Sequence, residues 1–172
     1  MLQLSRLSRG EMKHERVDLS ALAQEEAARL VESLGNRQVE FIIQPGLTAQ
    51  GDSHLLGIAL QNLLNNACKF TGTRELARVE FGQTQQNSKD VFFVRDNGVG
   101  FDMIYAKKLF GAFQRMHKQN EFPGNGIGLA TVQRIVHRHG GSIWADSSPD
   151  KGAVFYFTLE GGLNEIKNNS AG

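Results

Sequence analysis

The sequence predicts an α+β fold, a two-layer α/β sandwich in which a mixed, about five-stranded sheet is covered on one face by about three helices. Three segments have apolar residues at helical spacing, and several short apolar runs have the composition of strands. Helices and strands interleave without the regular βαβ alternation of a doubly wound sheet. At 172 residues, one domain with one core is expected.

The helices are predicted from their ends and their apolar faces. The first begins after Asp18, an N-cap residue, and ends near Gly35. The second covers residues 53–70, and the third covers 126–139, where Gly140-Gly141 ends it. The apolar face of the second helix consists of Leu56, Leu60, Leu63, Leu64 and Ala67.

Short runs of β-branched and aromatic residues predict the strands. These runs are 39–43, 78–81, 91–95, 142–145 and 153–159. Pro45-Gly46 ends the first of them, and the last alternates well enough to face a core on one side.

Composition excludes several classes of function. The formal net charge of +1 gives no general attraction to nucleic acid or to a membrane surface. The apolar run 55–60 is far shorter than the roughly 20 residues that cross a bilayer, and Arg6 and Arg9 interrupt the N-terminal leucines, unlike a signal peptide. The single cysteine, Cys68, suits a reducing compartment. We expect a soluble, cytoplasmic domain with no nucleic-acid partner and no direct membrane insertion.

Two amides, a lysine and an aromatic ring share one face of the second helix. Asn62, Asn66, Lys69 and Phe70 are separated by helical spacings. An Asn oxygen is a ligand that Mg²⁺ accepts when phosphates supply the remaining charge, a lysine meets a phosphate as a point charge, and Phe70 can stack on a base or pack under it. The alternative is a merely polar face, but asparagines are poor helix formers, and three of them, with Asn65, favour a functional site.

A buried strand ends at Asp96, which begins the motif Asp96-Asn97-Gly98-Val99-Gly100. A carboxylate at a strand end is well placed to accept a hydrogen bond from an exocyclic amine such as adenine N6. Gly98 and Gly100 allow a sharp turn and close approach to a planar ligand. The alternative is an ordinary Asp-Asn-Gly turn, which is the better interpretation of this motif taken alone.

A second glycine motif, Gly124-Asn125-Gly126-Ile127-Gly128-Leu129, opens the third helix. Backbone N–H groups at a helix N-terminus favour an anion. The motif lacks the preceding strand of the dinucleotide fingerprint, and no Lys-Ser/Thr follows as in phosphate-loop NTPases. It is therefore a weak indication of phosphate binding when taken alone.

In this order, the three motifs resemble the ATP-binding catalytic domain of sensor histidine kinases, within the wider group of gyrase-type and chaperone ATPases. Residues 109–117 resemble the phenylalanine box of these kinases, and residues 122–124 and 140–144 are most similar to phytochrome-type kinases. The resemblance implies a Bergerat-type ATP-binding fold with ATP and Mg²⁺ as cofactors. Lys151-Gly152 matches a further, weaker turn of the family.

The resemblance also implies the roles of individual residues. Asn66 is the expected metal ligand, and Asp96 is the expected adenine contact. The other expected nucleotide-binding residues are Asn62, Lys69, Phe70, Gly98, Gly100, Arg115, Gly124, Gly126, Gly128 and Leu129. Phe70 stands where Tyr is common in the family, and Asn125 stands where Thr or Ser is common.

The polar segment 118–123 between the phenylalanine box and the glycine motif has the composition of a lid. Arg115 is a candidate for a lid cation that reaches the phosphates, and a solvated surface arginine is the alternative. Lys69 is the second candidate phosphate contact. No residue is assigned a catalytic role in the chemical step.

One position separates kinases from ATPases. Gyrase-type and chaperone ATPases carry a glutamate, the general base, four residues before the metal-binding asparagine. Here this position is Asn62, and an amide cannot accept a proton at neutral pH. The substitution favours a histidine kinase, while an ATPase of the same group and a non-catalytic nucleotide-sensing module remain the alternatives.

The expected phosphoacceptor is missing from the five histidines of the chain, His14, His54, His117, His137 and His139. His14 is followed by an acidic residue but not by the proline of an acceptor helix. The expected partners are therefore a dimerisation and phosphoacceptor domain and a response regulator. We expect residues 1–17 to be the remnant of a dimerisation helix with a linker, 18–160 to be the catalytic domain, and 161–172 to be a disordered tail.

Overall fold

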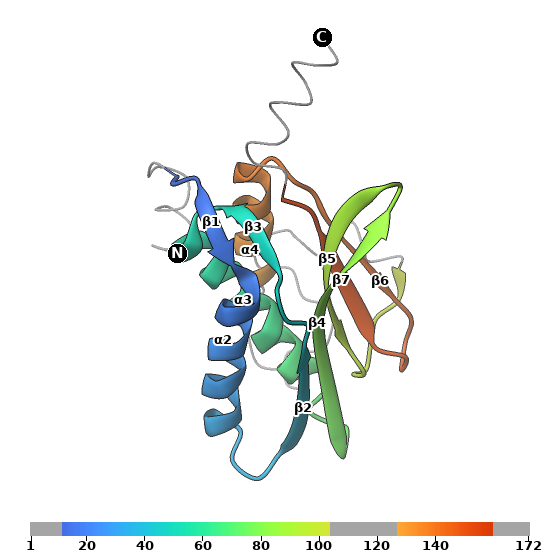
Figure 1. Ribbon diagram of the computed structural model, residues 1–172. Coiled ribbons are helices and arrows are strands. Elements are labelled where there is room, and N and C mark those ends of the chain that lie inside the picture. Colours follow the sequence, from blue (N-terminus) through green and yellow to red (C-terminus); the bar gives the residue numbers. More distant parts are fainter. Residues whose placement is uncertain (1–11, 104–126, 160–172) are drawn as a thin grey trace.

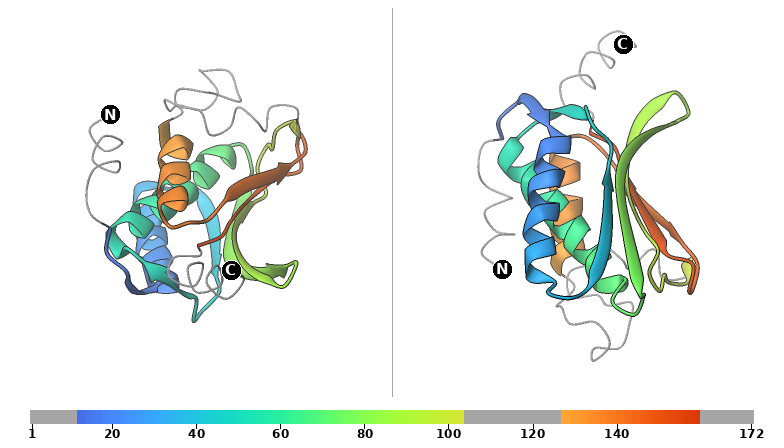
Figure 2. Two further views of the ribbon diagram at one scale, coloured as in Figure 1. Left: turned by 90° about the horizontal axis from the view of Figure 1, so that it is seen from above. Right: turned by 60° about the horizontal axis from the view of Figure 1, so that its bottom comes forward.

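The computed structural model describes residues 12–103 and 127–159, which form a sheet with helices on one face (Figure 1). In this part of the chain the main sheet has five strands in the order β2-β4-β5-β7-β6. Both views in Figure 2 show the helices α2, α3 and α4 on the same side of the twisted sheet. The predicted α+β sandwich with a mixed sheet is confirmed.

The elements lie close to their predicted positions. The helices are α2 (Leu19–Ser33), α3 (Ser53–Phe70) and α4 (Ile127–Arg138). The main-sheet strands are β2 (Gln38–Ile43), β4 (Leu76–Gln86), β5 (Lys89–Asp96), β6 (Ile143–Ser147) and β7 (Ala153–Phe157). No helix in the described ranges is long and apolar enough to cross a membrane.

Helix α3 lies at the centre of the helical layer, in contact with α2, α4 and the sheet. Its N-cap is Asp52, whose Oδ1 accepts hydrogen bonds from the backbone N–H groups of His54 (3.0 Å) and Leu55 (3.1 Å). The predicted apolar face is buried in the core. Burial of that face orients the opposite, polar strip of the helix away from the core.

The side chains of Arg37 and of Thr71, the C-cap residue, cap the C-terminus of α3. Arg37 donates from Nη1 to the Cys68 carbonyl (3.0 Å) and from Nη2 to the Thr71 carbonyl (3.0 Å). Thr71 is fully buried, and its hydroxyl donates to the Ala67 carbonyl (2.9 Å). These bonds satisfy carbonyls that the helix end leaves free, and they hold the backbone at Phe70 in place.

Pairing within the sheet is mixed, because β2 runs parallel to β4 and the other neighbours are antiparallel. The β4–β5 hairpin is longer than its apolar residues predict. It closes with the pair Gln86 and Lys89 around a two-residue loop in which Asn87 and Ser88 have φ of 53° and 66°. These angles are typical of the primed turns that match strand twist. The strand extension is polar, so its composition alone does not predict a strand.

A second, two-stranded sheet in the described residues was not predicted. Strand β1 (Glu15–Asp18) pairs antiparallel with β3 (Thr48–Gly51) next to the N-termini of α2 and α3. The first three residues of β1 lie in the segment 1–17, for which a helix remnant and a linker were expected. Both strands are four residues long, which is too short for a clear alternating pattern.

A buried histidine joins the C-terminal end of α4 to the start of α3. His139 is 1% exposed, and its Nδ1 donates to the Ile135 carbonyl (2.8 Å), which leaves Nε2 to accept from the Asp52 N–H (3.1 Å). The approach is so close that a Cβ at Gly51 would lie 2.5 Å from the imidazole Cδ2. Burial lowers the pKa of His139, which keeps the ring neutral.

We expect His139→Phe to destabilise the domain by about 2 kcal/mol, because the new ring leaves the buried Asp52 N–H without a partner.

In the wild type, the lowered folded-state pKa of His139 means that the unfolded chain takes up a proton before the folded one as the pH falls through about 6.5. Stability is therefore lost on the acid side of that value. Urea unfolding at neutral and mildly acidic pH measures both effects, and a variant as stable as the wild type would contradict this account.

Candidate functional site

The polar strip of α3 is partly exposed, as predicted. Asn62, Asn66 and Phe70 are half-buried and Lys69 is exposed. Asn62 donates from Nδ2 to the Ile58 carbonyl (2.9 Å), which leaves its Oδ1 on the side of α4. This oxygen would lie 3.1 Å from a Cβ at Gly128, in the first turn of α4. Within the strip, Asn62 therefore faces the start of α4.

The side-chain amide of Asn66 has no hydrogen-bond partner among residues 12–103 and 127–159. It lies one helical turn beyond Asn62, and its oxygen can act as a neutral ligand for a hard cation. The described ranges hold no group of three His, Cys, Asp or Glu side chains that could bind a metal alone. The residues present therefore fit a Mg²⁺ ion that takes most of its ligands from phosphates and water, with one amide from the protein.

Asp96 ends β5 and is 5% exposed. Its Oδ1 accepts from the backbone N–H of Gly98 (2.8 Å). Burial raises the pKa of the carboxyl to about 6, against the lowering effects of the Gly98 and Ala153 N–H groups and of the Arg74 cation. At neutral pH this gives an ionised acceptor that is almost shielded from water, and such an acceptor favours a ligand that donates a hydrogen bond.

The loop after Asp96 packs directly against the end of α3. The Val99 N–H donates to the Phe70 carbonyl (3.1 Å), and a Cβ at Gly98 would lie 2.3 Å from the same oxygen. Gly100 has φ of +65°, and a Cβ there would lie 2.1 Å from the Ser148 carbonyl oxygen. The sequence predicted that Gly98 and Gly100 allow close approach to a planar ligand. In the structure, the nearest atoms to both positions are backbone carbonyl oxygens of the protein.

The remaining predicted residues are placed only in part. Gly128 and the half-buried Leu129 lie in the first turn of α4, and Leu129 packs against the core. Outside the described residues lie Arg115, Gly124 and Gly126, together with the phenylalanine box and the segment 118–123. The structure therefore brings Asn62 of α3 next to Gly128 of α4, and the turn from Asp96 to Gly98 next to Phe70 at the end of α3. We call this region the α3–β5–α4 junction; Asn66 and Lys69 lie on α3 between Asn62 and Phe70.

The sequence did not reveal two residues that organise this junction. Ser147 is 8% exposed; its hydroxyl donates to the Gly152 carbonyl (2.6 Å) and accepts from the Phe101 N–H (2.9 Å). Arg74 donates to carbonyls of the 97–100 loop. The weak Lys151-Gly152 turn was the one sequence feature that pointed to this region.

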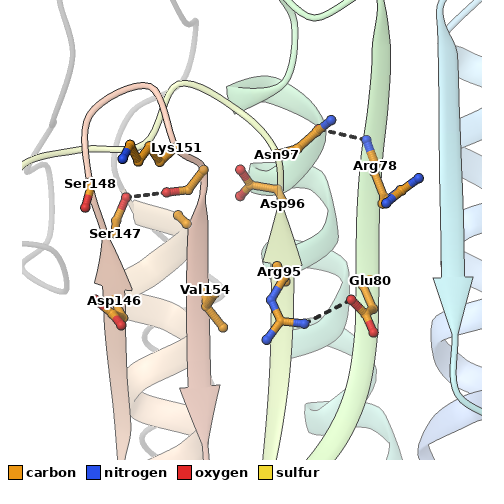
Figure 3. A pocket seen from close by; sticks show the side chains of 12 residues that line it. Arg78, Glu80, Arg95, Asp96, Asn97, Asp146, Ser147, Ser148, Lys151 and Val154 are labelled. Carbon is orange, nitrogen blue, oxygen red and sulfur yellow. Dashed lines mark hydrogen bonds and ion pairs between the residues drawn. The ribbon is translucent and has the colours of Figure 1, made fainter.

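A separate pocket of about 420 Å³ opens on the face of the sheet turned away from the helices (Figure 3). Arg95 pairs with Glu80 there (3.0 Å), and Asp146, Lys151 and Val154 also line it. Asp96 and Asn97 border the pocket at the strand ends, whereas the asparagine strip does not line it. This pocket shares Asp96 with the predicted site but lies on the opposite face of the sheet from the asparagine strip of α3.

Comparison with known proteins identifies the family that has this arrangement. Residues 51–162 match the family described as Histidine kinase-, DNA gyrase B-, and HSP90-like ATPase. This chain belongs to that ATPase family. The matched region of the ATPase domain includes α3, β5 with the loop after Asp96, and α4, which are the elements that form the site.

Similar proteins include named histidine kinases. Methanogenesis regulatory histidine kinase FilI of Methanothrix harundinacea is 44% identical over 101 residues, which are 59% of this chain and 11% of FilI. Phytochrome-like protein Cph1 of Synechocystis sp. is 31% identical over 142 residues, which are 83% of this chain and 19% of Cph1. This ATPase-family chain thus spans between about a tenth and a fifth of the length of these relatives.

Solved structures give the same result. A mycobacterial sensor histidine kinase, MprB, is 27% identical with a TM-score of 0.69, covering 85% of this chain and 96% of that one. Full-length ShkA, solved in complex with AMPPNP, is 26% identical with a TM-score of 0.73, covering 91% of this chain and 33% of that one. The predicted resemblance of this ATPase-family domain to histidine kinase catalytic domains is confirmed.

Proposed function

We propose that this domain binds ATP with Mg²⁺ and transfers the γ-phosphate to a histidine on a separate dimerisation and phosphoacceptor domain, in two-component signal transduction. One observation carries the proposal: the loop that holds the buried Asp96 carboxylate is bonded to the end of the asparagine helix at Phe70. A base acceptor and a strip of phosphate and metal ligands are thereby held in one unit. Family membership and the AMPPNP complex of ShkA support it.

Each residue then has a defined task. Asp96 accepts a hydrogen bond from the exocyclic amine of adenine, which explains a buried acceptor at this position. Asn66 is the metal ligand, and Asn62 and Phe70 line the nucleotide. Bound Mg²⁺ neutralises charge on the phosphate oxygens. Further contacts proposed for the nucleotide and its phosphates are Lys69, Gly98, Gly100, Arg115, Gly124, Gly126, Gly128 and Leu129.

Transfer to histidine is favoured over hydrolysis by the chemistry of Asn62. An imidazole nitrogen is already nucleophilic and displaces ADP from the γ-phosphorus without strong activation. Water needs a general base, and the amide of Asn62, whose nitrogen donates to the Ile58 carbonyl, is not one. A histidine kinase therefore fits this site better than an ATPase of the same family.

ATP binding is tested by calorimetry on the wild type and on Asp96→Ala. We expect binding by the wild type and a loss of at least about tenfold in the variant, because a charge-assisted hydrogen bond to the base is removed. Asp146→Ala, at an exposed position of β6, is the matched control and should bind like the wild type. Equal binding by Asp96→Ala would contradict the site assignment.

The transfer step is tested with a separately supplied dimerisation helix pair and labelled ATP. We expect acid-labile label on the supplied histidine and none on this chain. Label on this chain would contradict the proposal and would make His14 the candidate phosphoacceptor. ATP binding without transfer to any supplied helix pair would instead support a nucleotide-sensing module. A response regulator is the proposed acceptor of the phosphoryl group from the labelled histidine.

A further inference from the structure

One arginine binds the 97–100 loop, which holds the proposed adenine acceptor Asp96 in place. Arg74 lies between α3 and β4, and its side chain is 31% exposed. Its Nε donates to the Asn97 carbonyl (2.8 Å), and its Nη2 donates to the carbonyls of Gly98 (2.9 Å) and Asp150 (3.2 Å). One side chain thus joins the end of the α3 region to the 97–100 loop and to the turn before β7.

These bonds fix the orientation of two successive peptide groups. In a trans peptide the C=O and the following N–H point in opposite directions. When Arg74 holds the Asn97 carbonyl, the Gly98 N–H points the other way, and it donates to Asp96 Oδ1 (2.8 Å). When Arg74 holds the Gly98 carbonyl, the Val99 N–H points the other way, and it donates to the Phe70 carbonyl (3.1 Å). Both peptide groups are therefore held at both ends.

The ion pair within this network is its weakest part. Nη2 of Arg74 also lies 2.8 Å from Asp150 Oδ1, but the Asp150 side chain is 82% exposed. Exposed pairs contribute little to stability. The bonds from the guanidinium to the carbonyls of the loop are charge-assisted and have the planar geometry of its donors. A lysine cannot reproduce that fork.

The charge of Arg74 also acts on Asp96. The groups that act on this carboxylate are the Gly98 and Ala153 N–H groups, the Arg74 cation and the buried Cys68 thiol of α3. Burial keeps the thiol neutral, with a pKa raised to about 11. Arg74 is thus the cation that helps to keep Asp96 ionised against the effect of burial.

We propose that Arg74 is a positioning residue for the nucleotide base: it orients the 97–99 peptide groups so that the Asp96 carboxylate is held ready for adenine against the end of α3. The proposal rests on the proposed ATP-binding function. It adds a residue outside the asparagine and glycine motifs, and it assigns that residue two separable effects, one of geometry and one of charge.

The test compares Arg74→Gln, Arg74→Lys and the control Arg78→Gln, a nearby arginine whose side chain pairs with exposed Glu40. ATP affinity is measured by calorimetry across the range from mildly acidic to mildly basic pH. We expect Arg74→Gln to weaken binding by about tenfold and to move the acid midpoint of binding to higher pH. Arg74→Lys should weaken binding but keep the wild-type midpoint, because it retains the charge. Arg78→Gln should match the wild type.

Amide hydrogen exchange without nucleotide provides a second measurement that does not depend on ATP. The Gly98 and Val99 amides should exchange faster in both Arg74 variants than in Arg78→Gln. If Arg74→Gln does not fold, the measurement on Arg74→Lys is sufficient for the test. Unchanged exchange at these two amides would overturn the proposal. Unchanged affinity and midpoint in Arg74→Gln would also overturn it while leaving the ATP site intact. A wild type that fails to bind ATP would instead refute the proposed function on which the inference rests.

Discussion

Replacing Asp96 by asparagine is expected to stabilise the nucleotide-free domain at neutral pH while it weakens ATP binding. Burial raises the pKa of this carboxyl from 3.8 to about 6. The group's contribution to stability is therefore fully present below pH 3.8 and is lost as the pH rises through about 6, because the unfolded chain releases its proton first. Above that value, the ionised form costs about 3 kcal/mol net of its hydrogen bonds and of the Arg74 cation, at 1.36 kcal/mol per unit of pKa.

Urea unfolding of both proteins at a series of pH values measures this effect. The stability of Asp96→Asn relative to the wild type should increase with pH by about 3 kcal/mol in all, with roughly half of the change complete at about pH 5. The asparagine oxygen can still accept from the Gly98 N–H, so the pH-dependent part isolates the charge. Asp146→Asn, at an exposed position, should show little change. A stability difference that does not vary with pH would contradict a buried, ionised carboxylate.

The same substitution should weaken ATP binding by about tenfold, because a neutral acceptor replaces a charged one. Calorimetry on the two proteins at neutral pH measures this change. Opposite effects on stability and affinity are expected where a site keeps an unfavourable buried charge for its ligand. An Asp96→Asn variant with wild-type affinity would show that the charge of Asp96 has no part in base recognition.

Gly98→Ala is expected to destabilise the domain by about 3 kcal/mol and to abolish ATP binding. Its Cβ would lie 2.3 Å from the Phe70 carbonyl oxygen, 2.7 Å from the Phe70 carbonyl carbon and 2.9 Å from Asp96 Oδ1. The first two are backbone atoms at the end of a capped helix, so the loop must move away from α3. That movement breaks the Val99–Phe70 hydrogen bond and displaces the base acceptor. Thermal and urea unfolding, together with calorimetry, measure both effects.

Gly57→Ala is the matched control, because Gly57 lies inside α3 and its new methyl group would meet only Leu22 Cδ2 at 3.8 Å. Alanine in a helix interior is more favourable than glycine, so this variant should gain about 0.5–1 kcal/mol. The two glycines should therefore respond in opposite directions. A Gly98→Ala variant as stable as the wild type would show that the loop does not require this close approach.

Much of the fold could be predicted because helices and strands depend on local patterns. The Asp18 cap and the end of α4 at Gly140 were identified from capping residues, and the apolar face of α3 from residue spacing; the structure confirms them. The β1–β3 sheet and the polar half of the β4–β5 hairpin were not predicted. Those segments become strands through pairing with distant residues, and their own composition does not indicate it.

For the candidate site, the motifs indicated which residues belong together but not what holds them there. Nothing in the sequence distinguishes Arg37 and Arg74 from solvated surface arginines, yet one caps α3 and the other holds the loop after Asp96. His139 likewise gave no indication that it is buried against Asp52. Each role depends on contacts between residues that are distant in the sequence.

The sequence by itself determined the secondary structure of the central elements, the position of the asparagine strip on the exposed side of α3, and the resemblance to histidine kinases. Periodicity and residue chemistry are sufficient for the first two, and the three motifs in their order carry the resemblance. Only the tertiary structure decided that Asp96 is buried with a raised pKa and that Gly98 and Gly100 allow backbone to meet backbone. It also decided that Arg74 joins three segments. Desolvation and close packing depend on the neighbours that folding brings together, and local sequence does not specify those neighbours.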